Sequence, residues 1–287
     1  MRNDDVIAAR QAVKAAFGLR ARSGFALDRP CDVYDLISQQ GLTLQFIDVP
    51  SLEGMYLEEP EVTRLCVCAR RPSGRQRLTA AHELGHRVFG HGTQLDAALD
   101  LRDRATDDSV EESVANTFAY SILMPPSAIQ RGFRSRGYDP QKPSPEQIYV
   151  VSGWLGVGFE TLVHHMRLSL KLISYSRYKQ LLKTDLTSLR AGMIGQSTNN
   201  DIWILDELWN GRDVHMQIGD YVTGLSTRGT ERFLNAVSPS AGQKVFSVSR
   251  IGECAAFLET SGRKVKLRVS RKEFIGFYEF RYLEEHD

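Results

Sequence analysis

The segment Arg77–His86 constrains this chain more than any other, because it places two histidines four residues apart in an apolar helical pattern. Its sequence is RLTAAHELGH. Four residues on an α-helix correspond to about 40° of rotation, so His82 and His86 leave the same face and can contact one ion. The apolar flanks predict a buried helix that begins near Thr79, where an unligated histidine pair would be costly.

The two histidines and Glu83 form the pattern HExxH, which is typical of zinc hydrolases. Neutral imidazoles leave Zn²⁺ with residual charge, so its bound water can be deprotonated near neutral pH. Glu83 is placed to take that proton and to pass it to the leaving amine. The pattern arises by chance in roughly one chain in a hundred of this length. The alternative is a surface helix that carries two exposed histidines.

A catalytic zinc site needs a third protein ligand and an open position for water. The helix predicted to start near Ser109 supplies one, because Glu112 shares the apolar face of Ala115 and Ala119. Glu111 is rotated away by about 100°, so we favour Glu112. The alternative is that both glutamates stabilise a helix N-terminus through the helix dipole. Asp107 and Asp108 are weaker candidates and are more typical of caps.

A zinc peptidase also needs a donor for the oxyanion of the tetrahedral intermediate. Four side chains near the motif could donate, and the sequence does not choose among them. The predicted strand at residues 63–69, just before the HExxH helix, could pair with an extended substrate at a sheet edge or lie inside a sheet. The candidate donors are Tyr56, Arg77, His91 and Tyr120.

The remaining pattern predicts an α+β chain with three parts. Residues 1–140 form a mostly helical zinc-peptidase domain with a small sheet, which includes a hairpin at residues 54–69. Residues 141–184 form a helix-turn-helix-like extension, whose first helix starts at Ser144 and Pro145. Residues 185–287 alternate short β-branched runs with Gly and Asn turns and predict a β-rich domain. We expect this part to be a sensor or partner-binding domain.

Composition excludes several classes of protein. The chain has 287 residues and a formal net charge of +1, which argues against a protein that coats nucleic acid. It shows neither an apolar run long enough to span a membrane nor a signal peptide. Its four cysteines do not form a disulfide framework, so we expect reduced thiols in the cytoplasm.

Two blocks of sequence together resemble the ImmA/IrrE family of metallo-endopeptidases. Residues 77–86 are similar to R-x-T-x-A-H-E-x-G-H, and residues 112–125 are similar to E-x-x-A-N-x-F-A-x-x-L-L-M-P, with Ile122 at a position usually held by Leu. The resemblance covers roughly residues 5–170. It implies that His82, His86 and Glu112 bind zinc and that Glu83 is the catalytic acid/base.

The resemblance also implies a substrate. Members of the family cleave a helix-turn-helix transcriptional repressor in the cytoplasm, which switches on genes under stress or on a mobile element. Residues 185–287 do not match the sensor domains of the family, so the trigger is not implied.

Two other segments allow a different function. Residues 146–166 resemble a helix-turn-helix unit, but the second helix carries Glu160 and little positive charge beyond Arg167, so we favour a packing role over DNA reading. On the predicted strand at residues 263–269, Lys264, Lys266 and Arg268 share one face. That face is either solvated or a site for an acidic partner.

We therefore expect an endopeptidase with one zinc ion per chain that cleaves a specific intracellular protein, with direct nucleic-acid binding as the weaker option. The runner-up is a non-catalytic transcription regulator of the helix-turn-helix type, in which the metal is structural or absent. A third possibility is a zinc or redox sensor whose β-rich domain binds the partner.

Overall fold

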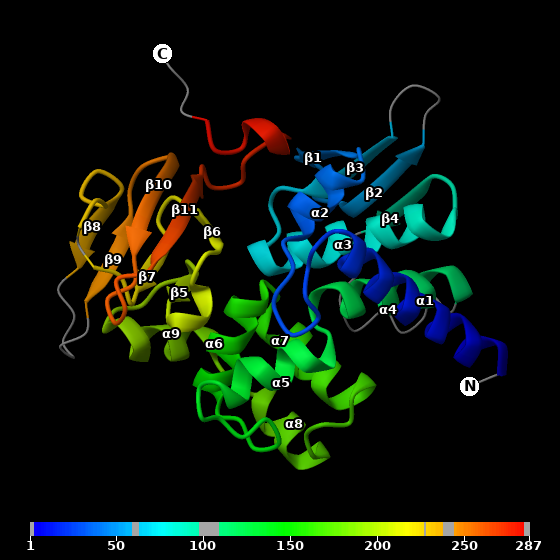
Figure 1. Cartoon of the computed structure of the whole chain (residues 1–287), viewed down its shortest axis with the longest axis horizontal. Helices are drawn as coiled ribbons and strands as arrows, with labels where there is room; N and C mark the ends of the chain where they lie inside the picture. Colours follow the sequence, from blue (N-terminus) through cyan, green and yellow to red (C-terminus); the bar gives the residue numbers. More distant parts are fainter. Residues whose placement is uncertain (1–2, 59–62, 98–108, 227, 238–243, 284–287) are drawn as a thin grey trace. The chain divides into compact units, whose positions relative to one another are not determined.

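The computed structural model describes residues 3–58, 63–97, 109–226, 228–237 and 244–283 (Figure 1). Contacts divide the chain into two compact units. The first unit contains Met1–Pro143, Val151–Tyr178 and Ile275–Tyr278. The second contains Ser144–Val150, Lys179–Phe274 and Glu279–Asp287. The fold is α+β with a β-rich C-terminal part, as the sequence predicts. The three domain boundaries drawn from the sequence stay predictions.

The first unit contains a five-stranded sheet in the order β12-β1-β3-β2-β4. β1 and β3 are parallel, and the other neighbours are antiparallel. β2 and β3 form the predicted hairpin, and its turn at residues 59–62 lies outside the described residues. Because β3 lies between β1 and β2, the prediction that it could pair with substrate at a sheet edge is wrong. The strands are β1 (Thr43–Ile47), β2 (Leu52–Glu58), β3 (Thr63–Cys68), β4 (Gln94–Ala97) and β12 (Gly276–Phe277).

Three helices pack into the core of this unit: α1 (Asn3–Arg22), α3 (Ser73–Phe89) and α4 (Val110–Leu123). α4 contacts both of the others. The buried Arg20 connects α1 to its surroundings, since its guanidinium donates to the carbonyl oxygens of Ile122 and Arg29. α4 ends where the sequence predicts, immediately before Met124 and two prolines.

α3 begins earlier than the sequence predicts. The sequence predicts a start near Thr79, but Pro72 precedes the first helical residue and Thr79 is buried inside the helix. Tertiary contacts stabilise the extra turns. Arg75 Nε lies 2.8 Å from Glu53 Oε2, and the Gln76 amide donates to the Ala69 carbonyl at 2.8 Å.

The other helices are shorter. The predicted capping box at the start of α6 is confirmed, because Ser144 and Gln147 exchange hydrogen bonds of 3.0 and 3.3 Å between backbone and side chain.

No helix among the described residues is both long and apolar enough to cross a membrane. The shorter helices are α2 (Val33–Gln39), α5 (Pro126–Arg134), α6 (Pro145–Leu155), α7 (Phe159–His164), a π-helical turn (His165–Ser169), α8 (Tyr175–Leu181) and α9 (Leu186–Ile194).

The second unit contains two small sheets, in the orders β5-β7-β9-β8 and β10-β11-β6. β11 alternates as predicted, with Val265, Leu267 and Val269 buried and the basic side chains on the other face. The strands are β5 (Ile202–Ile204), β6 (Asp213–Gln217), β7 (Tyr221–Thr223), β8 (Leu234–Val237), β9 (Val245–Val248), β10 (Gly252–Phe257) and β11 (Lys264–Ser270).

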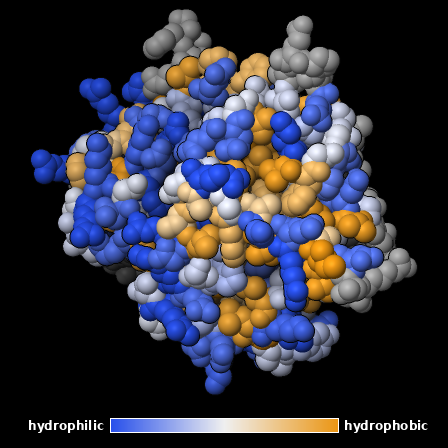
Figure 2. All heavy atoms as spheres, turned by 45° about the vertical axis from the view of Figure 1, so that its right-hand side comes forward, coloured by the Kyte–Doolittle hydropathy of each residue, from blue (hydrophilic) through white to orange (hydrophobic). Residues whose placement is uncertain are grey.

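Some hydrophobic residues reach the surface. On the face drawn in Figure 2, hydrophobic side chains lie in small groups between hydrophilic ones. Single exposed apolar residues of this kind are normal in folded proteins and need no partner to explain them. All four cysteines are free thiols, as expected.

Asp220 is a buried carboxyl group in the core of the second unit. Its Oδ2 accepts hydrogen bonds from the Trp203 indole at 3.0 Å and from the Gln217 backbone at 2.9 Å. Burial, together with the nearby charge of Asp201, raises the pKa of Asp220 to about 7. The folded state therefore prefers the protonated form, whereas an unfolded chain ionises this group near pH 4.

We expect the stability of the second unit to fall as pH rises through the range from about 4 to 7. The stabilisation from protonated Asp220 is complete below the pKa of the unfolded state and is lost as pH passes the folded pKa. Asp220→Asn keeps the acceptor oxygen and removes the titration. Its thermal midpoint, followed by circular dichroism, should therefore decline less between pH 5 and 8 than that of the wild type, by a few degrees. Asp185→Asn, at an exposed cap, serves as the control. If the thermal midpoints of wild type and Asp220→Asn declined in parallel with pH, Asp220 would not be the source of the pH dependence.

Candidate metal centre

α3 presents two buried histidines on one face. His82 and His86 are 1% and 0% exposed, and their Nε2 atoms lie 2.9 Å apart. The helix continues past both residues and ends at Gly90, whose φ of +67° is the left-handed conformation that favours glycine at this position. The helical spacing read from the sequence thus brings both imidazoles to one point.

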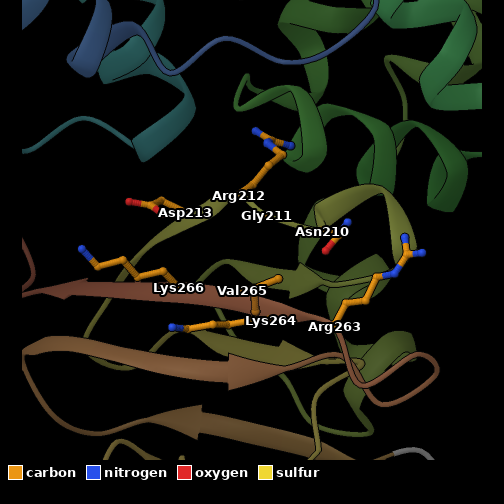
Figure 3. Close-up of a pocket in the computed structure, with 8 residues that line it drawn as sticks. All are labelled: Asn210, Gly211, Arg212, Asp213, Arg263, Lys264, Val265 and Lys266. Atoms are coloured by element: carbon orange, nitrogen blue, oxygen red, sulfur yellow. The ribbon is translucent and has the colours of Figure 1, made fainter.

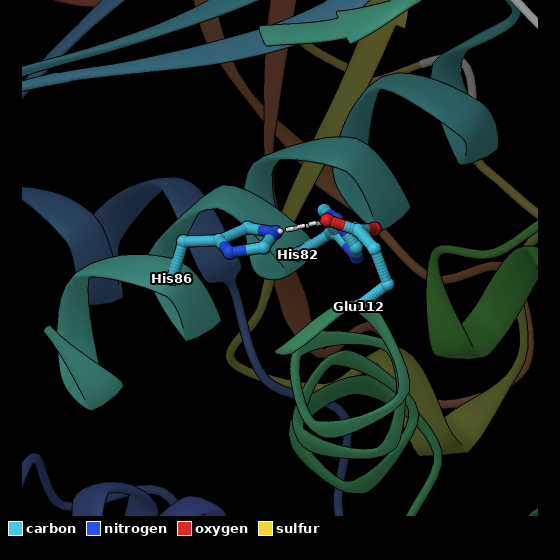
Figure 4. A group of neighbouring side chains, drawn as sticks. All are labelled: His82, His86 and Glu112. Atoms are coloured by element: carbon cyan, nitrogen blue, oxygen red, sulfur yellow. Dashed lines mark hydrogen bonds and ion pairs between the residues drawn. The ribbon is translucent and has the colours of Figure 1, made fainter. Parts of the chain in front are cut away.

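α4 supplies a carboxylate to the same point (Figure 4). Glu112 Oε2 lies 3.2 Å from His82 Nε2, and Glu112 Oε1 lies 3.2 Å from His86 Nε2. Ser109 caps this helix, since its Oγ accepts from the Glu112 backbone at 3.1 Å. Glu111 is exposed, in agreement with the preference for Glu112. Asp107 and Asp108 lie outside the described residues.

The two helices can approach closely because small residues face each other at their contact. A Cβ atom placed on Gly85 would lie 3.1 Å from Ala115 Cα and 3.2 Å from Phe118 Cδ1. Such distances are tighter than ordinary van der Waals contact, so a larger residue at position 85 would push α4 away. Gly85 therefore sets the helix separation at which the Glu112 carboxylate reaches both imidazoles.

Each imidazole is held from behind by a second polar group. His82 Nδ1 lies 3.1 Å from Asn116 Oδ1, and the ring N–H donates to this carbonyl oxygen. His86 Nδ1 lies 2.9 Å from His91 Nδ1, which gives it a second ring nitrogen as partner. Hydrogen bonds of this kind fix the ring orientation and leave the Nε2 lone pair of His82 directed at the cluster.

The donor set fits a metal ion. Tetrahedral zinc with bonds of about 2.0–2.2 Å requires its ligand atoms to be about 3.3 Å apart. The three separations in the cluster, 2.9, 3.2 and 3.2 Å, are close to that value. Close contact with the imidazole rings of His82 and His86 holds the pKa of Glu112 well below its usual range, so the carboxylate is ionised. The cluster of His82, His86 and Glu112 is thus compatible with metal binding.

Glu83, adjacent to the first histidine, is completely buried beside β2. A Cβ atom on Gly54 would lie 2.6 Å from Glu83 Oε1 and 2.4 Å from Thr79 Cγ2. The absence of a side chain at position 54 therefore makes room for the carboxylate between strand and helix. The catalytic role of Glu83 stays a prediction, as do the roles of the three candidate ligands.

The four candidate oxyanion donors occupy different surroundings. His91 contacts the cluster through His86, and burial, followed by the neighbouring His86, lowers its pKa. Tyr56 is fully buried in β2, where burial raises the pKa of its phenol. The Arg77 guanidinium lies 5.7 Å from the ring centre of Tyr34. The Tyr120 ring lies 5.2 Å from that of His165. The choice of donor stays a prediction.

The sequence analysis missed three residues that shape the site: Asn116, Gly54 and Gly85. Asn116 could have been found, because it lies four residues after Glu112 and so shares its helix face. Gly54 and Gly85 could not, because the contacts that require glycine there come from elements distant in the sequence.

We expect the purified protein to bind about one divalent ion per chain, and His82→Ala to lose it. Metal analysis by mass spectrometry after gel filtration measures this. His164→Ala is the matched control, because His164 pairs with Tyr178 instead. Asn116→Ala should retain the ion but bind it about 10–100-fold more weakly, because the His82 ring loses its orienting partner. Full metal content in His82→Ala would rule out this centre.

Comparison with known proteins finds a family model that matches the part of the chain that contains the cluster. The model of the IrrE N-terminal-like domain, a peptidase domain, matches residues 37–174. A Mycobacterium tuberculosis transcriptional regulator of known structure is similar at 17% identity and a TM-score of 0.35, over 55% of this chain and 46% of that chain. The match thus spans less than half of that regulator's length. No curated protein matches. The matched segment contains both the α3 histidines and the α4 glutamate, so the match supports membership of the ImmA/IrrE family for this part of the chain.

Proposed function

We propose that this chain is a zinc-dependent endopeptidase that cleaves a specific intracellular protein. The observation that carries the proposal is the convergence of His82, His86 and Glu112 beside the buried carboxylate of Glu83. The peptidase family of residues 37–174 supports the same reaction class. The candidate substrate is a helix-turn-helix transcriptional repressor, whose cleavage in the cytoplasm switches on stress-response or mobile-element genes. This part of the proposal rests on the resemblance to the family.

The side chains divide the chemistry between them. His82, His86 and Glu112 would hold the ion with three protein ligands, which is the number found in catalytic zinc sites. When bound, zinc acts as a Lewis acid that polarises a carbonyl group and makes water acidic enough to lose a proton near neutral pH. Asn116 and His91 contact the outer nitrogens of the imidazole rings and would keep these rings oriented for metal binding.

Glu83 would move the proton. One of its carboxylate oxygens accepts a proton from the attacking water, and the resulting carboxylic acid returns that proton to the nitrogen of the leaving amine. Its position in a buried space beside Gly54 shields the carboxylate from bulk water. Peptide hydrolysis is balanced by this sequence, because the water supplies the hydroxyl group to the new acid and the proton to the new amine.

The alternative function, a helix-turn-helix regulator that reads DNA, has less support. α7, the helix that would enter a DNA groove, buries most of its residues and exposes Glu160. The turn before it is used for packing, because a Cβ atom on Gly74 of α3 would lie 2.5 Å from the Gly158 nitrogen. The segment therefore supports the first turns of α3 in the same unit, as the sequence analysis favoured.

Replacing Glu83 by Gln should leave the metal content unchanged and lower the cleavage rate by about 10²–10⁴-fold, since the amide cannot accept the proton. The assay incubates purified protein with the helix-turn-helix regulators encoded beside its gene and follows the fragments by mass spectrometry. Glu111→Gln, in which an exposed carboxylate is replaced, is the matched control and should cleave at the wild-type rate. Wild-type cleavage by Glu83→Gln would refute the assigned role.

Gly54→Ala tests whether the space beside β2 positions Glu83. The added methyl group would lie 2.6 Å from Glu83 Oε1, so the carboxylate must move. We expect the cleavage rate to fall at least tenfold while the metal stays bound, because a small displacement of a catalytic group costs much of its effect. Gly153→Ala, on α6 where an added Cβ meets no atom within 4 Å, is the control. Equal rates for Gly54→Ala and wild type would show that the close approach is irrelevant to catalysis.

A further inference from the structure

The second unit contains a pocket at the starts of β6 and β11 that the peptidase proposal does not use (Figure 3). Its volume is about 450 Å³, within the range of about 300–1,000 Å³ that is typical of small-molecule sites. Apart from Val265, its lining side chains are polar or charged, and four of them are cationic. The pocket is lined by Asn210, Gly211, Arg212, Asp213, Arg263, Lys264, Val265 and Lys266.

Backbone pairing holds the walls of this pocket in place. β6 and β11 are parallel neighbours, with Asp213 opposite Lys266. The Gly211 N–H donates to the Lys264 carbonyl at 3.3 Å, and the Lys266 N–H donates to the Arg212 carbonyl at 3.3 Å. The cationic side chains therefore extend from a hydrogen-bonded frame and not from a loose loop.

The positive charge is concentrated at the pocket. Two other cations of β11 are offset by acidic side chains, because Lys266 Nζ lies 2.6 Å from Glu253 Oε2 and Arg268 Nε lies 2.7 Å from Glu253 Oε1. Arg268 also pairs with Asp213 at 3.5 Å. Lys264 and Arg263 are exposed, and the structure records no ion pair for either with any residue that it describes. Figure 3 shows their charged ends on opposite sides of the pocket.

Arg212 adds a positioned guanidinium group. Its Cζ lies 4.7 Å from the ring centre of Trp209, and the indole N–H of this buried tryptophan donates to the Ile204 carbonyl at 3.1 Å. Stacking on a fixed aromatic ring reduces the freedom of the guanidinium, so less entropy is lost when it binds an anion. Arginine in such a position presents paired N–H donors that match the oxygens of a phosphate group.

We propose that this pocket binds a phosphorylated small molecule. Arg212, Arg263 and Lys264 all line this one pocket, and a group of three cations favours a ligand with more than one negative charge. Nucleic acid is less well matched, because a duplex needs cations spread along its backbone, whereas Lys266 and Arg268 of β11 are already paired with Glu253 and Asp213. The site shares no residue with the candidate metal centre, so it stands independently of the peptidase proposal.

The test is isothermal titration of the full-length protein with pyrophosphate and with ATP at low salt. We expect both probes to bind, and the double variant Arg263→Ala and Lys264→Ala to bind at least tenfold more weakly. The two side chains are exposed and their backbone hydrogen bonds remain, so the fold should persist, which circular dichroism checks. Arg232→Ala, an exposed arginine of the same unit outside the pocket, should bind as the wild type does.

Three results would overturn the proposal. One is the absence of binding of either probe to the wild type at millimolar concentration. Another is equal affinity in the wild type and in the folded double variant, which would place the binding elsewhere. The third is tighter binding of a 20-base-pair DNA duplex than of both small probes, lost in the double variant, which would assign the cations to nucleic acid.

Discussion

The close contact between α3 and α4 determines whether this molecule has a metal centre at all. Two imidazoles buried on one helix are an electrostatic cost without a partner, and the partner is a carboxylate on a different helix. Glu112 reaches both Nε2 atoms at 3.2 Å only because Gly85 lets the backbone of α4 approach within ordinary contact distance. A side chain at that position would separate the helices and leave the histidines and the glutamate apart.

The lack of a side chain also makes room for Glu83, the candidate catalytic residue. Glu83 is buried between α3 and β2, and it fits there because position 54 carries no side chain. The surrounding polar groups are arranged in layers, with Asn116 and His91 behind the imidazoles.

The two units carry different chemistry. In the first unit a few buried groups converge on one point and suit a single cation. In the second, exposed cations surround an open pocket and suit an anion. Both sites lie at the ends or faces of regular elements and have backbone hydrogen bonds behind them. Both are built from residues that the structure describes.

The sequence by itself determined the local features, since periodicity and capping act over a few residues. It predicted the shared face of His82 and His86, the inward position of Glu112 on its helix, the end of α4 at the prolines and the alternation of β11. Only the tertiary structure decided the start of α3, the internal position of β3 and the return of β12 to the first sheet. The separation of α3 and α4 at Gly85 also belongs to this group. These features depend on contacts between residues far apart in the chain, such as Arg75 with Glu53 or Gln45 with Phe277. No local sequence pattern encodes the free energy of such contacts.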